Sequence, residues 1–425
     1  MRIAYLLPDP GIPVGGVKGA SVHVAEITRA LARAGNRVLL VAMRAAGSAP
    51  DGVDLVVLDP GPLGRGPGGD AGRIAAVERF LAQAEPAIRA FGPDLLIERL
   101  SLFAGGGTDL ARRLGVPRLV EINAPVTAER AGYQGVADAT LGEQLERRAL
   151  LGAHAVAVSP PLAEWARSRG VAHVTVVPNG VDVERFAPDP ARAADVRRSF
   201  GIEGADVVGF AGSLKPWHGV DVLLGAAVHL ADRRPRLRLL IVGDGPERAG
   251  LEAVAAATLP GRVHFAGPVP SAAMPAHLAA FDVATAPYVM PASGVGFYFS
   301  PLKVVEAMAA ARPVVASRFG PIEDLLAGWG RLVPPGDPAA LAVALDDALD
   351  DPRASELAAG GRRRATSTHA WSAVARRILA AAPRGAAPAT SADGTATTSA
   401  DPATPADGAT PTGTAAAASA GRTAA

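Results

Sequence analysis

Three lysines are the side chains of this sequence whose type and placement most directly suggest chemistry. The chain has 42 basic side chains, and 42 − 3 = 39 of them are arginines. Lys18, Lys215 and Lys303 each lie in a segment that predicts a loop, namely GGVKGA, GSLKPWHG and SPLKVVE. Lysine is a compact point charge that suits phosphate, whereas arginine presents a broad planar fork. Three rare residues can also fall in loops by chance, so the neighbouring residues must decide between the two interpretations.

The segment FYFSPLKVVEAMAA, residues 297–310, predicts a helix that begins at an anion site. Ser300 is a favourable N-cap residue, and Pro301 suits the first helical position. The free amides of that first turn and the positive end of the helix dipole attract an anion, and Lys303 adds a charge. Glu306 lies one turn further along the same side, where its carboxylate can accept hydrogen bonds from ribose hydroxyls. An ordinary capped helix with a solvated Lys–Glu pair is the structural alternative.

Two glycine turns follow predicted strands in the second half of the chain. In VGFAGSLKPWHGVD, Gly212 lets the backbone approach a ligand closely, and Lys215 can reach a phosphate. A common strand–helix turn, with Trp217 packed locally, is the alternative interpretation. In LLIVGDGP the glycines, which begin at Gly243, do not have the GxGxxG spacing, and this disfavours a nicotinamide dinucleotide site.

Polar residues also end predicted strands in the first half. The glycine loop with Gly16 and Lys18 follows the first strand, at the sheet edge where ligands of such sheets bind. The pair Glu98–Arg99 ends another strand, and Glu121 and Asn123 mark the end of a third. We expect these side chains to face a cleft, where an acid could bind an acceptor hydroxyl; an ion pair between Glu121 and Arg99 is the structural alternative. The histidines have no metal-type spacing, and no nucleophilic triad or carboxylate pair is established.

Short apolar strands alternate with alanine-rich amphipathic helices along the chain. Strands that are apolar throughout and separated by helices form parallel sheets covered on both faces, so two such series predict two doubly wound Rossmann-like domains. The turn-rich connector after PNGVD places the boundary near residue 190, with domains at 1–190 and 191–365. After Leu379 no large aliphatic or aromatic residue occurs, which predicts a disordered tail over 383–425. The predicted strands span 2–7, 37–42, 55–58, 94–98, 118–122, 155–159 and 174–177, then 207–211, 237–242, 263–266, 283–286 and 313–317.

The composition excludes several classes of protein. The formal net charge of +1 over 425 residues argues against a dedicated nucleic-acid binder. The absence of cysteine excludes a disulfide framework and any cysteine-based metal site. The N-terminal apolar run is interrupted by Pro8 and Asp9, so it predicts a buried strand rather than a signal peptide, and no run reaches the length of a membrane helix. We therefore expect a cytoplasmic protein, with any membrane contact being peripheral at the inner face.

The order and spacing of these loops resemble the retaining glycosyltransferases of family four. The resemblance extends from Met1 to about Trp371. It is carried by the two glycines after the first strand and by the segments VSPPL, VVPNGVD, FAGSLKPWHGVD, IVGDGPER, FAGPVP, AFDVATAPY and SPLKVVEAMAAARPVVAS. It implies the GT-B architecture: two facing Rossmann-like domains with a cleft between them. It also implies a closing helix, at 366–382, that crosses back to the first domain.

The resemblance implies a nucleoside-diphosphate sugar as donor and co-substrate, a hydroxyl acceptor, retention of anomeric configuration, and no metal or other cofactor. Residues 191–365 would hold the donor, with Glu306 on the ribose and Lys215 on the diphosphate, while residues 1–190 would face the acceptor. The implied catalytic residues are Glu121, Asn123 and Lys215. The acceptor-side residues are Lys18, Arg99, Glu121 and Asn123. The donor-binding residues are Gly16, Gly212, Ser213, Lys215, Gly243, Val269, Pro270, Phe299, Ser300, Pro301, Leu302, Lys303 and Glu306.

This sequence departs from the family pattern at several positions. The first acid of the family's Glu-x7-Glu pattern is replaced by Tyr298, and the two basic residues of the phosphate loop are replaced by Ser213 and His218. Asn123 stands where a histidine is common, and Ala311 where a glycine is usual. Lys215 is the predicted substitute for the missing loop cations. Two alternatives to a transferase follow: a nucleotide-sugar epimerase of the same fold, or a catalytically degenerate donor-binding or scaffolding partner.

Overall fold

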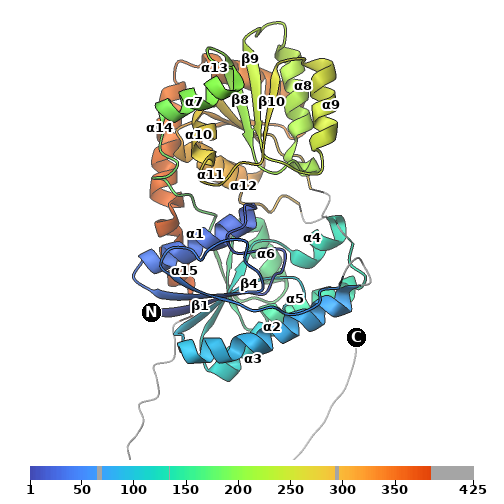
Figure 1. Cartoon of the computed structure of the whole chain (residues 1–425), viewed down its shortest axis with the longest axis vertical. Coiled ribbons are helices and arrows are strands. Elements are labelled where there is room, and N and C mark those ends of the chain that lie inside the picture. Colours follow the sequence, from blue (N-terminus) through green and yellow to red (C-terminus); the bar gives the residue numbers. More distant parts are fainter. Residues whose placement is uncertain (65–68, 134, 292–295, 384–425) are drawn as a thin grey trace, which may run out of the picture. The chain divides into compact units, whose positions relative to one another are not determined.

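The structure, a computed structural model, describes residues 1–64, 69–133, 135–291 and 296–383. These residues form two parallel sheets, and both belong to one compact unit that begins at Met1. Apart from Pro383, the tail that the sequence predicts to be disordered lies outside the described residues. The prediction of two doubly wound parallel sheets is confirmed (Figure 1).

The first sheet has seven parallel strands in the order β3-β2-β1-β4-β5-β6-β7. The order reverses beside β1, and this places the switch point, where such sheets bind ligands, between β1 and β4. The strands are β1 (Arg2–Leu7), β2 (Arg37–Ala42), β3 (Val53–Val57), β4 (Leu95–Arg99), β5 (Arg118–Ile122), β6 (His154–Ala157) and β7 (His173–Val176). The helices among them are α1 (Gly19–Arg33), α2 (Asp70–Phe91), α3 (Gly107–Leu114), α4 (Val126–Tyr133), α5 (Ala139–Leu150) and α6 (Pro160–Ser168).

Alternation along β1 explains how this sheet is covered on both faces. Ile3, Tyr5 and Leu7 pack with α1 in one cluster, whereas Ala4 and Leu6 pack with α2 and α3 in another. All five side chains are fully buried. Because successive side chains of a strand point to opposite faces, an uninterrupted apolar strand requires helices on both sides.

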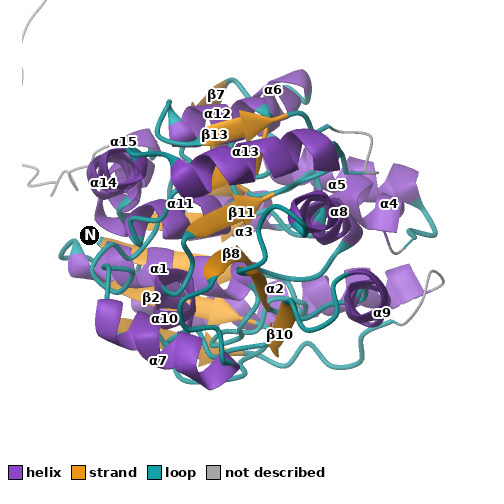
Figure 2. Cartoon of the chain, turned by 90° about the horizontal axis from the view of Figure 1, so that it is seen from above, coloured by secondary structure: helices purple, strands orange, loops and turns teal. Residues whose placement is uncertain are grey.

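The second sheet repeats this arrangement with six parallel strands in the order β10-β9-β8-β11-β12-β13. Figure 2 shows these strands with α8 and α9 on one side and α7 and α10 on the other. The strands are β8 (Asp206–Ala211), β9 (Leu237–Val242), β10 (Val263–Gly267), β11 (Val283–Ala286), β12 (Val314–Ser317) and β13 (Arg331–Val333). The helices are α7 (Pro190–Phe200), α8 (Val220–Leu230), α9 (Arg248–Thr258), α10 (Met274–Ala279), α11 (Leu302–Ala309), α12 (Gly320–Leu326), α13 (Pro338–Asp350) and α14 (Ala354–Arg364), with a 3-10 turn η2 (Pro216–His218).

The chain returns to the first sheet at its last helix. A π-helical turn, η3 (Ala365–His369), leads into α15 (Trp371–Ala381), which packs beside α1 in the core of the first sheet. The segment around Val181, which leaves the first sheet, lies beside the segment that leads back to it. The Val181 amide donates to the His369 carbonyl at 2.7 Å, and the Trp371 amide donates to the Val181 carbonyl at 3.2 Å. The boundaries that the sequence predicts near residues 190 and 365 stay predictions. None of the described helices is both long and apolar enough to cross a membrane.

Candidate active site

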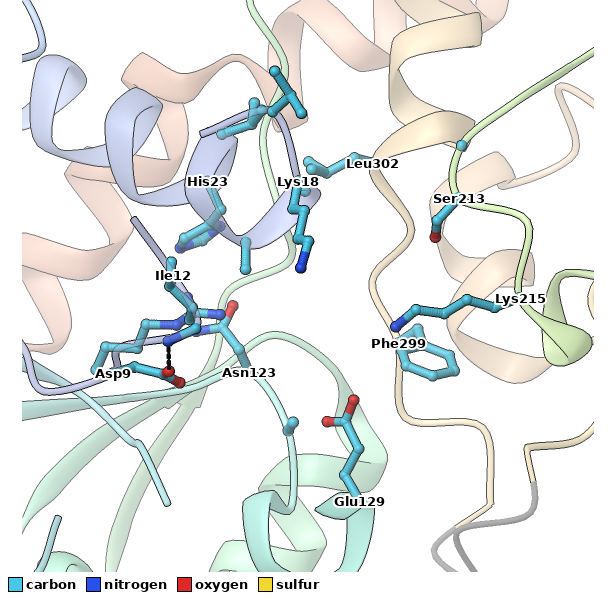
Figure 3. A pocket seen from close by; sticks show the side chains of 18 of the residues that line it. Asp9, Ile12, Lys18, His23, Asn123, Glu129, Ser213, Lys215, Phe299 and Leu302 are labelled. Atoms are coloured by element: carbon cyan, nitrogen blue, oxygen red, sulfur yellow. Dashed lines mark hydrogen bonds between the residues drawn. The ribbon is translucent and has the colours of Figure 1, made fainter. Parts of the chain in front are cut away.

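The carboxyl ends of both sheets open into one large cavity. Its volume is about 1630 Å³, which exceeds the roughly 300–1,000 Å³ of an ordinary small-molecule pocket and leaves room for two substrates. Most of the residues that the sequence singles out line this cavity, and Figure 3 shows several of them from close by. They are Lys18, Arg99, Asn123, Gly212, Ser213, Lys215, Gly243, Val269, Phe299, Ser300, Pro301, Leu302, Lys303 and Glu306.

Three predicted site residues do not line the cavity. Gly16 is enclosed by its own loop, because a Cβ there would meet the Ser21 hydroxyl at 2.8 Å. Pro270 is also absent from the lining, although its neighbour Val269 contributes to it. Glu121 lies beneath the cavity floor with 2 % of its surface exposed. The sequence predicts that all three contact substrate, but none of them is among the residues that line the cavity.

Glu121 instead holds other side chains in place. Its carboxylate accepts a hydrogen bond from the Tyr5 hydroxyl and bonds to Nε2 of His23, whose ring does line the cavity. Burial alone would raise the pKa of Glu121, but the charge and hydrogen bond of His23, followed by the nearby Arg99, hold the pKa at about 2. The carboxylate is thus ionised and fully occupied. The direct ion pair with Arg99 that sequence reasoning considered is not formed, and the partner of Glu121 is His23.

Glu98 and Arg99, adjacent in β4, point to opposite faces of the sheet. Glu98 is buried against Arg118, with 2.6 Å between Oε2 and Nε, and takes no part in the cavity. Arg99 is one of the residues that line the cavity. The expectation that both residues face the cleft is therefore wrong for Glu98, because consecutive strand residues alternate between faces.

The start of α11 lies one residue later than the sequence predicts. Pro301, not Ser300, is the N-cap residue, and it makes no side-chain cap. The Ser300 hydroxyl accepts a hydrogen bond from the Asn179 amide at 2.9 Å, and the Asn179 side chain donates to the Ser300 carbonyl at 2.7 Å. Proline has no N–H, so the first amides that the helix can offer to an anion are those of Leu302 and Lys303.

Lys303 places a buried cation at the carboxyl edge of the second sheet. Its Nζ lies 4.1 Å from the ring centre of Phe210 and 4.7 Å from that of Tyr288. Nζ also lies 2.9 Å from the point where a Cβ on Gly212 would stand. Among the described residues, this ammonium has no hydrogen-bond partner. Burial lowers the pKa of Lys303 to about 7, although nearby Glu306 acts to raise it.

Glu306 is buried beside Lys303, and burial shifts its pKa in the opposite direction. Burial raises the pKa of Glu306 to about 7, while Arg185 and Lys303 act to lower it. Lys303 and Glu306, one turn apart on α11, therefore both carry charges that burial disfavours, and the Lys303 ammonium has no hydrogen-bond partner among the described residues. Such a pair is costly in the free protein unless a ligand completes it.

Two glycines form the backbone floor beside Lys303. Gly212 has φ +145° and Gly243 has φ +136°, values that L side chains rarely adopt. A Cβ on Gly243 would overlap the carbonyl oxygen of Gly212, so the two turns are in direct backbone contact. The close contact removes side chains from this part of the floor and leaves room for a bulky anion.

The loop after Gly212 lacks the cations of the family pattern, and its histidine does not replace them. Nδ1 of His218 donates to the Ser213 carbonyl, which fixes the ring. Burial, followed by the charge of Lys303, lowers the pKa of His218 to about 2, so this ring is neutral at physiological pH. The positive charge at this end of the cavity therefore comes from Lys303 on α11 and from Lys215.

Lys215, Lys18 and Glu129 face one another across the cavity (Figure 3). Nζ of Lys215 lies 4.6 Å from the ring centre of Trp217. Burial lowers the pKa of Lys215, Glu129 acts to raise it and Lys18 to lower it, so all three charges are within electrostatic reach. Glu129, on α4, is a site residue that sequence reasoning missed, because nothing in the run NAPVTAER distinguishes it from an ordinary exposed helical acid.

Comparisons with known proteins agree with the fold. Residues 205–351 match the family described as glycosyl transferases group 1, and residues 17–185 match glycosyltransferase family 4. The chain is 30% identical over 421 residues to the D-inositol 3-phosphate glycosyltransferase of Kineococcus radiotolerans, which covers 88% of this chain and 91% of that protein. It is 36% identical over 197 residues to the 2-deoxystreptamine glucosyltransferase of Streptomyces kanamyceticus, over 44% of this chain and 48% of that protein.

A solved structure supports the same architecture. Sucrose-phosphate synthase from Thermosynechococcus elongatus superposes with a TM-score of 0.71 at 24% identity, covering 89% of this chain and 97% of that one. The fold and cavity thus define a GT-B protein. The chain belongs to glycosyltransferase family four, and it transfers a sugar from a nucleoside-diphosphate sugar to a hydroxyl acceptor. The epimerase alternative finds no support among these relatives.

Proposed function

We propose that this glycosyltransferase holds its donor diphosphate against Lys303 and the start of α11, and that it retains anomeric configuration without a metal ion. The observation that carries this proposal is the buried ammonium of Lys303, which has no hydrogen-bond partner among the described residues and lies beside two bare glycine turns. A diphosphate supplies the missing acceptors and the negative charge that restores full protonation of this lysine.

Neighbouring residues bind the other parts of the donor in this proposal. The amides of Leu302 and Lys303 and the positive end of α11 add donors for phosphate oxygens. Glu306, one turn further on, then accepts hydrogen bonds from the ribose hydroxyls. The base lies toward Val269 and Met274, which line the cavity at the side of the second sheet.

The remaining cavity suits an acceptor on the side of the first sheet. Asn123 lines the cavity, and its buried side-chain nitrogen has no hydrogen-bond partner among the described residues. Lys18 and Arg99 lie on the same side. Both reported relatives act, by their names, on cyclitols, so cyclitols are the first acceptors to test.

The chemistry follows from where charge develops. As the bond between the sugar and the outer phosphate breaks, negative charge builds on the diphosphate, and Lys303, Lys215 and the helix amides stabilise it. The acceptor oxygen bonds to the sugar carbon from the same face, and its proton passes to the departing phosphate oxygen. We assign Glu121 no role as a base, because its carboxylate is bonded to His23 and Tyr5 and does not line the cavity.

A thermal-shift panel of UDP-, GDP-, ADP- and TDP-sugars tests the donor site, since a bound donor raises the apparent stability by mass action. We expect one nucleotide class to raise the melting temperature of the wild type, and Glu306→Gln to abolish most of that shift. Glu203→Gln, at an exposed residue outside the cavity, is the matched control. A panel without any shift would favour a degenerate scaffold that binds no donor.

Product analysis tests whether the enzyme retains anomeric configuration and whether it works without a metal ion. With the donor identified, NMR of the product should show the anomeric configuration of the donor, and transfer should continue in excess chelator. An inverted product would contradict the same-face mechanism, and loss of transfer on chelation would show that a metal ion takes part.

A further inference from the structure

The five carboxylates that line the cavity differ in where their partners lie. Three of them, Asp9, Asp59 and Asp244, accept hydrogen bonds from the nearby backbone amides of Gly11, Gly61 and Gly245 at 2.7–2.9 Å. Glu306 lies on α11, and the charge of Arg185 does most to keep it ionised, ahead of that of Lys303. Glu129 is different: the two groups that do most to keep it ionised, Lys215 and Tyr298, come from the half of the molecule that carries the second sheet.

Glu129 extends from α4 into the cavity, and in Figure 3 its carboxylate lies in the open space between Asn123 and Lys215, near the ring of Phe299. Burial raises the pKa of Glu129 above its ordinary value, and the charge of Lys215, followed by the interaction with the Tyr298 side chain, acts in the opposite direction to keep it ionised. The same Glu129 raises the pKa of Lys215. The carboxylate and the ammonium are thus electrostatic partners across the cavity.

Charge decides what such a carboxylate can bind. It would repel a diphosphate, so it does not hold the phosphates that Lys215 attracts. The sugar of the donor is bonded to the outer phosphate and therefore lies next to Lys215, and its hydroxyls are neutral hydrogen-bond donors. An ionised carboxylate accepts up to about four hydrogen bonds and suits such hydroxyls well.

We propose that Glu129 binds the hydroxyls of the donor sugar from the first-sheet side of the cavity, and that Tyr298 is a positioning residue for its carboxylate. This inference rests on the proposed function, because it takes the diphosphate to lie at Lys303 and Lys215. It makes the first sheet, which otherwise faces the acceptor, part of donor selection. After transfer, the nucleoside diphosphate carries extra negative charge and no sugar, so Glu129 also disfavours the product.

The test compares two affinities rather than one. Calorimetric titrations of the full chain would use UDP with UDP-glucose, or GDP with GDP-mannose, according to which pair stabilises the wild type more. Glu129→Gln should weaken binding of the nucleotide sugar about tenfold, as expected for the loss of a charged hydrogen-bond acceptor. Binding of the nucleoside diphosphate should be unchanged or tighter. Glu164→Gln, at an exposed helical acid outside the cavity lining, should change neither affinity.

Each other outcome has a definite meaning. If Glu129 only locks Lys215 in the free protein, Glu129→Gln will tighten both ligands by the same factor, and the proposal is overturned. It is also overturned if neither affinity changes. If the wild type binds no nucleotide sugar, the proposed function fails before Glu129 is tested.

Tyr298→Phe separates positioning from packing. It should lower the preference for nucleotide sugar over nucleoside diphosphate by a smaller factor than Glu129→Gln does. The double variant should match Glu129→Gln alone, because the phenol acts through that carboxylate. Independent, multiplicative effects of the two substitutions would contradict the positioning role.

Discussion

Replacing Lys303 with methionine should make the free protein more stable while impairing its ligand binding. Burial lowers the pKa of Lys303 from 10.5 to about 7, which corresponds to about 5 kcal/mol of unfavourable charge burial at about 1.36 kcal/mol per pKa unit. The contacts of the ammonium with the rings of Phe210 and Tyr288 offset this cost by about 1–2 kcal/mol each. Methionine keeps the apolar stem without the charge, so we expect a net gain of about 2 kcal/mol. For domains of this size, such a gain raises the melting temperature by about 4–8 °C.

The pH dependence of that gain has a definite sign. Because the folded-state pKa of Lys303 lies below its unfolded-state value, the cost of burying the charge is fully present below pH 7 and disappears as pH rises toward 10.5. Lys303→Met should therefore stabilise the protein most near pH 6–7 and very little at pH 10. Thermal unfolding monitored by circular dichroism at several pH values would measure this.

Ligand binding should move in the opposite direction. Loss of a charged hydrogen bond to phosphate costs about 1.5–3 kcal/mol, so the affinity for nucleoside diphosphate should fall by about one to two orders of magnitude. Affinity for the nucleoside alone should change little. A variant that is less stable than the wild type at pH 7, with undiminished diphosphate affinity, would refute the reasoning and make Lys303 a structural partner of Glu306.

Three other predictions concern the same cavity. Lys215→Ala should weaken nucleoside diphosphate by about tenfold or more and nucleoside much less, and calorimetry showing equal losses would remove Lys215 from the phosphate contacts. Binding of diphosphate at pH 8 should take up a proton, because Lys303 is largely neutral at this pH before binding and charged afterwards. The measured binding enthalpy should therefore vary with the ionisation enthalpy of the buffer. A binding enthalpy that is the same in all buffers would contradict this prediction. Glu121→Ala should destabilise the protein by about 3–5 kcal/mol by leaving His23 and Tyr5 unpartnered, without changing diphosphate affinity. The pKa of Glu121 is depressed to about 2, so its contribution to the free energy of unfolding is present above pH 4.5 and is lost as pH falls toward 2. Chemical denaturation at several pH values would measure this loss.

Local patterns in the sequence were sufficient to predict the parallel sheets. Strands such as Arg2–Leu7 and Leu237–Val242 were predicted with the bounds that the structure shows, because apolar runs between helices are typical of strands buried on both faces. The short strand β13 was missed. Its three residues lie between Gly330 and Pro334, and they carry too little pattern to be recognised.

The part of the cavity beside α11 was more predictable than the part beside the first sheet. Lys303 and Glu306 were predicted to lie together because one helix start sets both positions, and both line the cavity. Glu121 was misassigned because its role depends on Tyr5 and His23, two residues far away in sequence. Glu129 could not be found at all, since Lys215 and Tyr298 meet it only through the tertiary fold. Contacts between distant segments leave no local signal in a single sequence.

A crystal structure of the protein with the nucleoside diphosphate that stabilises it most would test the central claim directly. We predict phosphate oxygens within hydrogen-bond distance of Nζ of Lys303 and of the first amides of α11, with the ribose hydroxyls on Glu306. A diphosphate bound at the edge of the first sheet, with Lys303 still unpartnered, would contradict it.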